Sequence, residues 1–308
     1  MTLQQLEYIV AVDNCRHFVR AAESCGVTQS TLSSLIQKLE AELDVTIFDR
    51  TSHPIRPTTL GEEIIAQARV VLYNASQMEE LVSTHKEQSV GHIRLGIAST
   101  ISPYILPKLF GYLKEHHPEI TLAVEEARIE TIKKKLRRAE LDVAMLAMPV
   151  AEEGLLEIPI YHERYYAYLN PTEANYNEAQ LDTQTLRSES IWVLGESYCP
   201  NHGQFPFCVR DMTNASIYAA GSVETLMRIV DENGGYTIIP EMQLPLMCGA
   251  QRERVRELYN PTPGRDVAFV VRRDFVRERM LNILADAIKS IIPEEMIEPR
   301  LRKFAIKL

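Results

Sequence analysis

The sequence predicts an α/β protein with three parts: a helix-turn-helix, a long linker helix, and a larger region in which strands and helices alternate. Three observations support this prediction. Apolar stripes at helical spacing, broken by a glycine, mark the first part. In the second part, apolar residues recur at alternating steps of three and four and form a seam along one side of a helix. In the third part, apolar runs alternate with amphipathic stretches. The expected domain boundaries are 1–58, 59–89 and 90–308, which suits a chain of 308 residues.

The composition argues against a membrane or secreted protein. Hydrophobic residues make up 45%, enough for ordinary cores, but no apolar run reaches the length of about 18 residues that a membrane span needs. The first residues lack the basic and apolar segments of a signal peptide, so we expect a cytoplasmic protein. The cysteines are few and scattered, unlike a disulfide framework; they are Cys15, Cys25, Cys199, Cys208 and Cys248.

The net charge of the chain excludes nucleic-acid binding through a generally positive surface. The net charge is -9, and the first sixty residues carry five Lys and Arg against seven Asp and Glu. Any binding of nucleic acid must therefore depend on a few well-placed cations and on polar contacts to bases.

The helix-turn-helix prediction comes from apolar spacing within the first 57 residues. Gly26 ends the second helix, and Thr28 is a suitable N-cap for the third. The three stripes are Leu3, Leu6, Ile9 and Val10; Phe18, Ala21, Ala22 and Cys25; and Leu32, Leu35, Ile36, Leu39 and Leu43.

The exposed face of the third helix is short, polar and nearly uncharged, which suits a helix that lies in the major groove of DNA. The alternative is an ordinary solvated face, although such a face would carry more Glu and Lys. The residues of this face are Gln29, Ser30, Ser33, Ser34, Gln37 and Lys38.

One long helix is predicted over 58–88. Thr59 and Glu62 match the capping-box pattern Thr-x-x-Glu. A seam this long usually meets a partner helix, so we expect dimerisation here, with packing against its own domain as the alternative. The seam consists of Leu60, Ile64, Ala68, Val71, Ala75, Met78 and Val82.

The α/β region should form a mostly parallel sheet covered on both faces, in two lobes. Ligand sites are expected beyond the carboxyl ends of strands, where Ser99, Thr100 and Ser102 lie, and at Ser222. The basic run 133–138 is interpreted as a solvated helix face. Strands are predicted at 93–97, 120–124, 143–147, 165–169, 191–194, 236–239 and 267–271, and helices at 103–117, 131–139, 223–232 and 277–292.

The first part resembles the LysR-type transcription regulators. The resemblance covers the segments 17–22, 28–33, 36–40, 48–50 and 57–61, in order. It implies a winged helix-turn-helix, a dimerising linker helix and a two-lobed regulatory domain like that of periplasmic binding proteins. By resemblance the residues directed toward DNA are Thr28, Gln29, Ser30, Ser33, Ser34 and Lys38, with Arg50, His53 and Arg56 in the wing.

Within that family the α/β region resembles the peroxide-sensing OxyR-type subfamily. Cys199 and Cys208 match its peroxidatic and resolving cysteines, while Thr100 and Arg265 match residues that approach the same pocket. The segment 222–226 matches as well. Two positions depart from the pattern: Tyr198 replaces a histidine and Ile129 replaces a threonine.

The resemblance implies a reversible Cys199–Cys208 disulfide, formed through a sulfenic acid, that controls oxidative-stress genes. The implied partners are double-stranded operator DNA, further copies of the chain in a dimer of dimers, RNA polymerase, hydrogen peroxide and cellular thiol reductants. No cofactor, metal or membrane is expected.

Other interpretations remain open at this stage. Cys199 and Cys208 could be ordinary buried thiols, or could bind a metal with His202, although structural zinc normally has four ligands. The protein could be a regulator that senses a small metabolite, or a thiol enzyme of the peroxidase kind. The N-terminal part argues against the enzyme.

Overall fold

The computed structural model describes residues 1–84, 91–186, 190–194, 216–218 and 222–308. It divides the chain into two compact units, Met1–Ser89 with Arg137–Glu140, and Val90–Leu136 with Leu141–Leu308. Among the residues it covers, no helix has the length and apolar character needed to cross a membrane.

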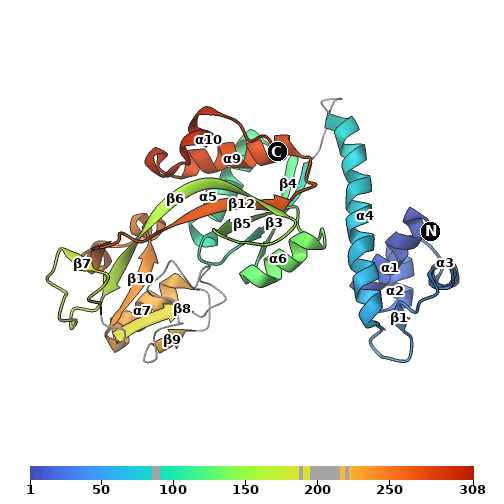
Figure 1. Cartoon of the computed structure of the whole chain (residues 1–308), viewed down its shortest axis with the longest axis horizontal. Coiled ribbons are helices and arrows are strands. Elements are labelled where there is room, and N and C mark those ends of the chain that lie inside the picture. Colours follow the sequence, from blue (N-terminus) through green and yellow to red (C-terminus); the bar gives the residue numbers. More distant parts are fainter. Residues whose placement is uncertain (85–90, 187–189, 195–215, 219–221) are drawn as a thin grey trace. The chain divides into compact units, whose positions relative to one another are not determined.

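Three helices form the core of the first unit, shown in blue in Figure 1: α1 (Leu3–Cys15), α2 (Phe18–Ser24) and α3 (Gln29–Leu43). Gly26 has a φ of 66°, a left-handed conformation that suits the turn between α2 and α3. Thr28 caps α3 as predicted, because its side chain accepts a hydrogen bond from the Thr31 N–H at 3.2 Å. Ala21 and Ala22 are buried, so the two helices pack closely.

Two short antiparallel strands, β1 (Phe48–Asp49) and β2 (Arg56–Pro57), form the wing that the resemblance implies. The linker helix α4 (Thr59–Thr84) follows directly.

The predicted cap of α4 is wrong by one residue. The Thr58 hydroxyl, not that of Thr59, accepts a hydrogen bond from the Gly61 N–H at 2.9 Å. The same hydroxyl donates to the Thr46 carbonyl at 2.7 Å. Thr58 is therefore held by the strand region before it, and this contact moves the start of the helix.

The seam of α4 is only partly covered. Ala68 is buried, whereas Leu60, Val71 and Met78 are exposed. Packing within the chain therefore buries one part of the seam. The other part remains as an exposed apolar stripe on α4.

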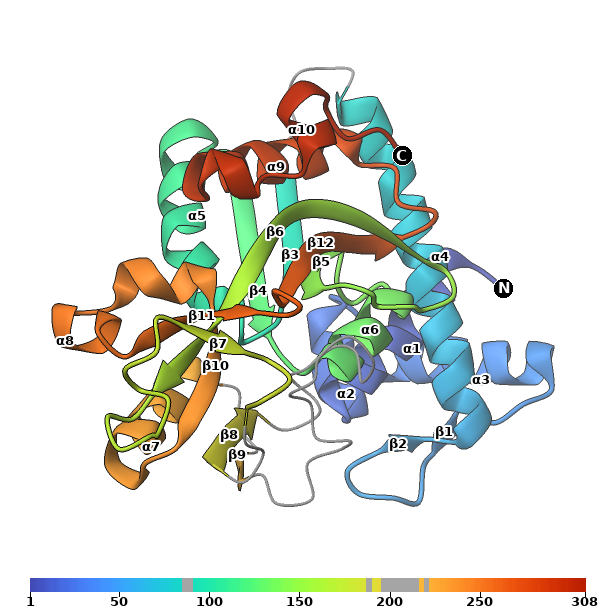
Figure 2. The same cartoon turned by 60° about the vertical axis from the view of Figure 1, so that its left-hand side comes forward.

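The first lobe of the second unit has a parallel core, β4–β3–β5, formed by β3 (Gly91–Ile97), β4 (Ile120–Glu126) and β5 (Val143–Ala147). Its helices are α5 (Ser102–His116), α6 (Ile129–Arg137) and α9 (Glu278–Ile291). A Cβ on Gly91 would meet Met280 of α9, and one on Gly96 would meet Ile132 of α6. These helices therefore cover opposite faces of β3, and α5 packs beside α9 (Figure 2).

Two long strands connect the lobes: β6 (Leu155–Leu169) and β12 (Gly264–Arg272), which run side by side and antiparallel (Figure 1). The sequence predicted only 165–169 and 267–271 of them. It also predicted a mostly parallel sheet, but the sheet is mixed, because β12 is antiparallel to both β5 and β6.

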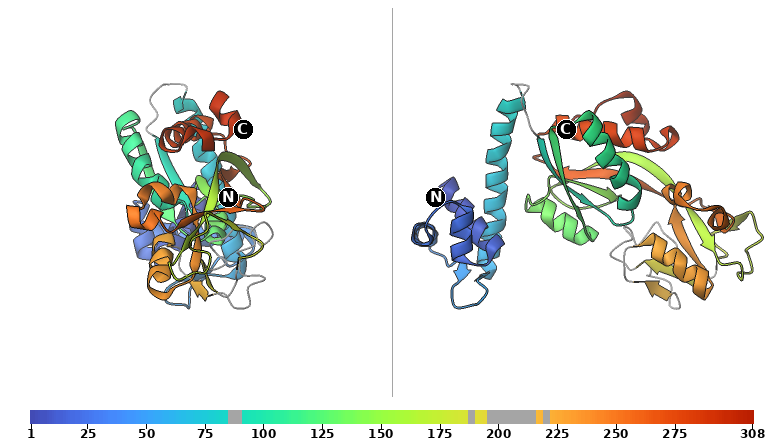
Figure 3. Two further views of the ribbon diagram at one scale, coloured as in Figure 1. Left: turned by 90° about the vertical axis from the view of Figure 1, so that its left-hand side faces the viewer. Right: turned by 180° about the vertical axis from the view of Figure 1, so that it is seen from behind.

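The second lobe contains β8 (Ile191–Leu194), β9 (Ser216–Tyr218) and β10 (Tyr236–Pro240), with β10 antiparallel to β6 (Figure 3). Helix α7 (Val223–Asn233) packs on them, with Ser222 as its N-cap. The remaining elements are β7 (Gln180–Asp182), the 3-10 helix η4 (Glu241–Leu246), α8 (Gly249–Arg252), β11 (Val255–Tyr259), η5 (Glu294–Met296) and α10 (Pro299–Lys303).

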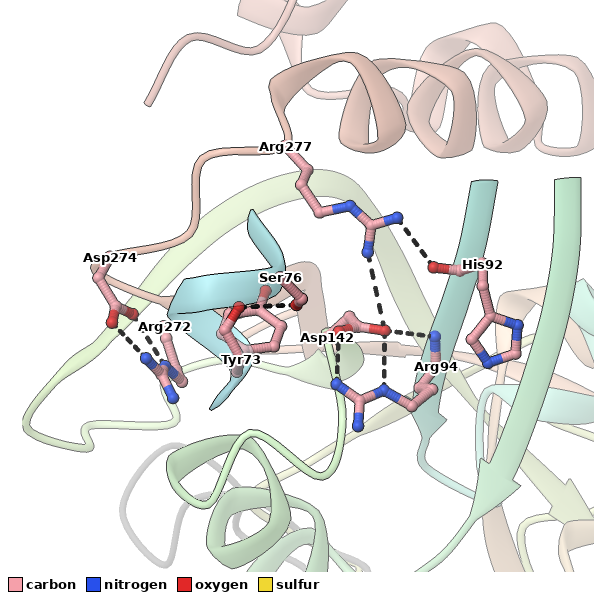
Figure 4. A network of polar contacts seen from close by, with 8 residues as sticks. All are labelled: Tyr73, Ser76, His92, Arg94, Asp142, Arg272, Asp274 and Arg277. Carbon is pink, nitrogen blue, oxygen red and sulfur yellow. Dashed lines mark hydrogen bonds and ion pairs between the residues drawn. The ribbon is translucent and has the colours of Figure 1, made fainter. Parts of the chain in front are cut away.

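A buried carboxylate anchors the start of the first lobe (Figure 4). Asp142 accepts two hydrogen bonds from the Arg94 guanidinium, at 3.1 and 2.7 Å, and one from the Arg94 N–H at 2.7 Å. Arg277 lies 3.9 Å from the same carboxylate and donates to the His92 carbonyl at 2.9 Å. This cluster fixes α9 to β3 and has a structural role.

Candidate functional site

The structure exposes most of the residues predicted to face DNA. Gln29, Ser30 and Ser34 are exposed near the N-terminal end of α3, as is Lys38 further along, whereas Ser33 is half-buried. Thr28 is exposed but its hydroxyl is used in the cap. No acidic side chain lies in the first turn of α3, so the end of the helix that is predicted to face DNA carries no charge that would repel phosphate.

The predicted wing cations differ in their surroundings. His53 and Arg56 are exposed. Arg50 instead donates to Glu40 at 2.9 Å and lies over the Phe18 ring at 5.5 Å. Glu40 also accepts from the Ile47 N–H at 2.8 Å. Arg50 therefore ties the wing to α3, a role that the sequence prediction did not include.

The second site lies where β3 ends and α5 begins. The structure brings Thr100 and Arg265 together although 165 residues separate them. Arg265 donates through Nη1 to the Thr100 hydroxyl at 2.9 Å and through Nη2 to the Thr100 carbonyl at 2.8 Å. Both residues are buried. The contact follows from the strand order, because β12 carries Arg265 into the first lobe while Thr100 follows β3.

A buried carboxylate faces Arg265 from the neighbouring strand. Glu163 and Arg265 are directly opposite in the register of β6 and β12, and Glu163 Oε1 lies 2.8 Å from Arg265 Nε. Burial lowers the pKa of the Arg265 guanidinium, but the Glu163 carboxylate raises it, and the net shift is upward. The guanidinium is therefore charged, and its charge is neutralised within the pocket.

Tyrosines surround this pair. The Tyr165 ring lies 5.6 Å from Arg265 Cζ. Burial raises the pKa of Tyr104, whose hydroxyl donates to Gln243 at 2.8 Å. Burial also raises the pKa of Tyr161 well above its usual value. The Tyr104 and Tyr161 phenols therefore stay protonated at neutral pH.

Two buried hydroxyls close to Thr100 and Arg265 have no partner among the residues that the structure describes: those of Ser99 and Tyr161. Ser102, the third predicted hydroxyl, donates to Glu126. Ile129, which replaces a threonine of the family pattern, is the first residue of α6. Cys199, Cys208, Tyr198 and His202 lie outside the described residues.

Sequence reasoning missed Glu163, Tyr104 and Gln243 as members of this site. No strand was predicted over 155–164, so nothing indicated that Glu163 would face inward. Glu163 has no exposed surface, which is unusual for a charged residue. Its membership of the site can be recognised only once the strand register shows that it lies opposite Arg265.

Comparison with known proteins identifies the family of both parts of the chain. Residues 3–62 match the bacterial regulatory helix-turn-helix protein, lysR family, and residues 86–291 match the LysR substrate binding domain. The chain therefore belongs to the LysR family, whose members are DNA-binding transcription regulators and not enzymes.

Individual relatives are similar over almost the whole chain. A hydrogen peroxide-inducible genes activator of Haemophilus influenzae is 31% identical, over 95% of this chain and 99% of that protein. The DNA-binding transcriptional dual regulator OxyR of Escherichia coli is 30% identical, over 94% of this chain and 95% of that protein. A full-length OxyR variant from Pseudomonas aeruginosa has a similar structure, with a TM-score of 0.81 and 32% identity over 97% and 98% of the two chains.

Proposed function

We propose that this protein is a DNA-binding transcription regulator that senses hydrogen peroxide and activates oxidative-stress genes. The observation that carries the proposal is the buried contact between Thr100 and Arg265, in a chain that is similar over its length to peroxide-inducible gene activators. The exposed polar face of α3 supports the DNA-binding half of the proposal.

The geometry supports a chemical role for Thr100. Its hydroxyl oxygen accepts a hydrogen bond from Arg265, so its own proton is free to be donated. A peroxide oxygen beside Thr100 would accept a hydrogen bond from this hydroxyl as the O–O bond lengthens, and Thr100 would keep its proton. Arg265 is engaged by Glu163, so it acts on peroxide chiefly by orienting Thr100.

The reaction proceeds in two balanced steps. The Cys199 thiolate attacks one peroxide oxygen, the O–O bond breaks, and a sulfenic acid and hydroxide form. The Cys208 thiol then condenses with the sulfenic acid, which gives a disulfide and releases water. Cellular thiols return the pair to the reduced state. The assignment of the two cysteines is supported by the sequence resemblance.

The finer assignments are part of the same proposal. Residues 1–58 read DNA, 59–89 dimerise and 90–308 sense peroxide. The DNA contacts are Thr28, Gln29, Ser30, Ser33, Ser34 and Lys38 on α3, with Arg50, His53 and Arg56 in the wing. Two dimers form a tetramer in the cytoplasm, and the bound tetramer contacts RNA polymerase.

A thiol titration tests the proposal. One equivalent of hydrogen peroxide should remove two free thiols from the reduced full-length chain, and peptide mapping should find Cys199 joined to Cys208. Cys199→Ser should not react, and Cys208→Ser should stop at the sulfenic acid. The exposed Cys248 supplies the control, since Cys248→Ser should behave as wild type. If both thiols stay free, a regulator of a small metabolite is the better description.

A further inference from the structure

The two carboxylate oxygens of Glu163 have different partners. Oε1 faces Arg265, at 2.8 Å from Nε and 2.7 Å from Nη2. Oε2 accepts a hydrogen bond from the Met242 N–H of η4 at 3.1 Å. The side chain has no exposed surface, so water does not compete for either oxygen. Its position is therefore set on one side by the second lobe and on the other by Arg265.

This arrangement fixes the direction of the Arg265 guanidinium. A guanidinium is planar, and its donors form a rigid fork. Since Nε and Nη2 lie on Glu163, the position of Nη1 is determined, and Nη1 donates to the Thr100 hydroxyl oxygen. That bond occupies one lone pair of the hydroxyl, so the Thr100 proton must point away from Arg265.

We propose that Glu163 is a positioning residue for the reaction with peroxide, acting through Arg265 on the orientation of the Thr100 hydroxyl. This inference rests on the proposed function. The same carboxylate holds the backbone of η4, so the orientation of the hydroxyl also depends on the position of the second lobe.

A simpler role would be neutralisation of a buried charge, and loss of activity alone would not separate the two roles. Glu163→Gln would weaken the fold in either case, because the amide cannot accept from both Arg265 and Met242. The roles differ in whether the effect of Glu163 requires the Thr100 hydroxyl. A double-mutant cycle measures this dependence.

The experiment follows peroxide oxidation of the full-length reduced chain by stopped flow in wild type, Glu163→Gln, Thr100→Val and the double variant. Each single change should slow oxidation about tenfold, as expected for a misplaced or missing donor. The double variant should be no slower than Thr100→Val, and Thr100→Ser, which keeps a hydroxyl, should be faster than Thr100→Val. Independent effects, about a hundredfold in the double variant, or an unchanged rate in Glu163→Gln, would overturn the inference.

Two controls keep the test decisive. Tyr168→Phe removes a hydrogen bond to Asp231 in the second lobe and should leave the rate unchanged. If Glu163→Gln does not fold, Glu163→Gln/Arg265→Gln removes both charges together, and adding Thr100→Val to it should again cause no further slowing. A wild-type chain that peroxide does not oxidise would overturn the proposed function as well, whereas independent effects in an oxidisable chain overturn this inference alone.

Discussion

Two arginine–glutamate pairs in this protein have similar contacts but differ in burial. In the first unit, Arg50 pairs with Glu40 and lies over Phe18. In the second unit, Arg265 pairs with Glu163 and lies over Tyr165. In both pairs the glutamate also accepts a backbone N–H, so each joins two elements of its unit.

The difference is exposure to water. The side chains of Arg50 and Glu40 are 34% and 13% exposed, but those of Arg265 and Glu163 only 4% and 0%. Water screens the first pair and does not reach the second. The difference fits the proposed function, in which the first unit would present side chains to DNA and the second would bury polar groups around a small reactant.

The largest effect on stability should come from the buried pair. Arg265→Ala leaves the Glu163 carboxylate buried without its counter-ion, which should lower the free energy of unfolding by about 3–5 kcal/mol. Urea unfolding of the full-length chain measures this. Arg164→Ala on the neighbouring strand β6 is the matched control, because its exposed guanidinium pairs with Glu241 at the surface and its loss should cost under about 1 kcal/mol. An equal decrease in the free energy of unfolding in the two variants would contradict the claim that the buried pair contributes more to stability than the exposed one.

The exposed stripe on α4 should govern assembly. Val71 is 41% exposed, so packing within the described part of one chain does not account for an apolar residue at this position. Val71→Glu would place like charges at a helix–helix contact and should give smaller species in sedimentation, with weaker operator binding. Asn74→Glu, at an exposed position outside the predicted seam, is the control. An unchanged mass for Val71→Glu would contradict dimerisation through this helix.

The exposed face of α3 should specify the operator. Gln29→Ala should lose about 1–3 kcal/mol of discrimination between operator and random DNA, while nonspecific binding stays near wild type. Competition binding at fixed salt concentration measures the ratio. Equal affinity of variant and wild type for both DNAs would show that Gln29 does not read bases.

The smallest effect on stability should come from the partly exposed Arg50–Glu40 pair. Arg50→Ala should lower the free energy of unfolding by about 0–1 kcal/mol. Because Glu40 already holds Arg50, this change should lower the salt slope of DNA binding by less than the value of about 1 expected for a lost phosphate contact. Arg56→Ala, at an exposed wing position, should show the full value. The reverse order would mean that Arg50 leaves Glu40 and makes the stronger phosphate contact of the two.

Much of the architecture was predictable because local patterns determine it. The Gly26 turn, the Thr28 cap and the α3 stripe depend on neighbouring residues. The structure confirms the turn and the cap, and it confirms the stripe except at its last residue, Leu43, which is exposed at the end of the helix. Thr58 replaced Thr59 as the cap of α4 because its hydroxyl also bonds to Thr46, a contact across twelve residues that helical spacing does not indicate.

The sequence by itself determined the family architecture, the polar face of α3 and, through resemblance, that Thr100 and Arg265 approach the same pocket. Only the tertiary structure decided what each arginine contacts. Arg50 meets Glu40 through packing of the wing on α3, and Arg265 meets Glu163 through the register of strands whose residues are about a hundred positions apart. The physical reason is that helical periodicity records which side of an element is apolar, whereas a buried charge is stabilised by partners that long-range strand pairing supplies.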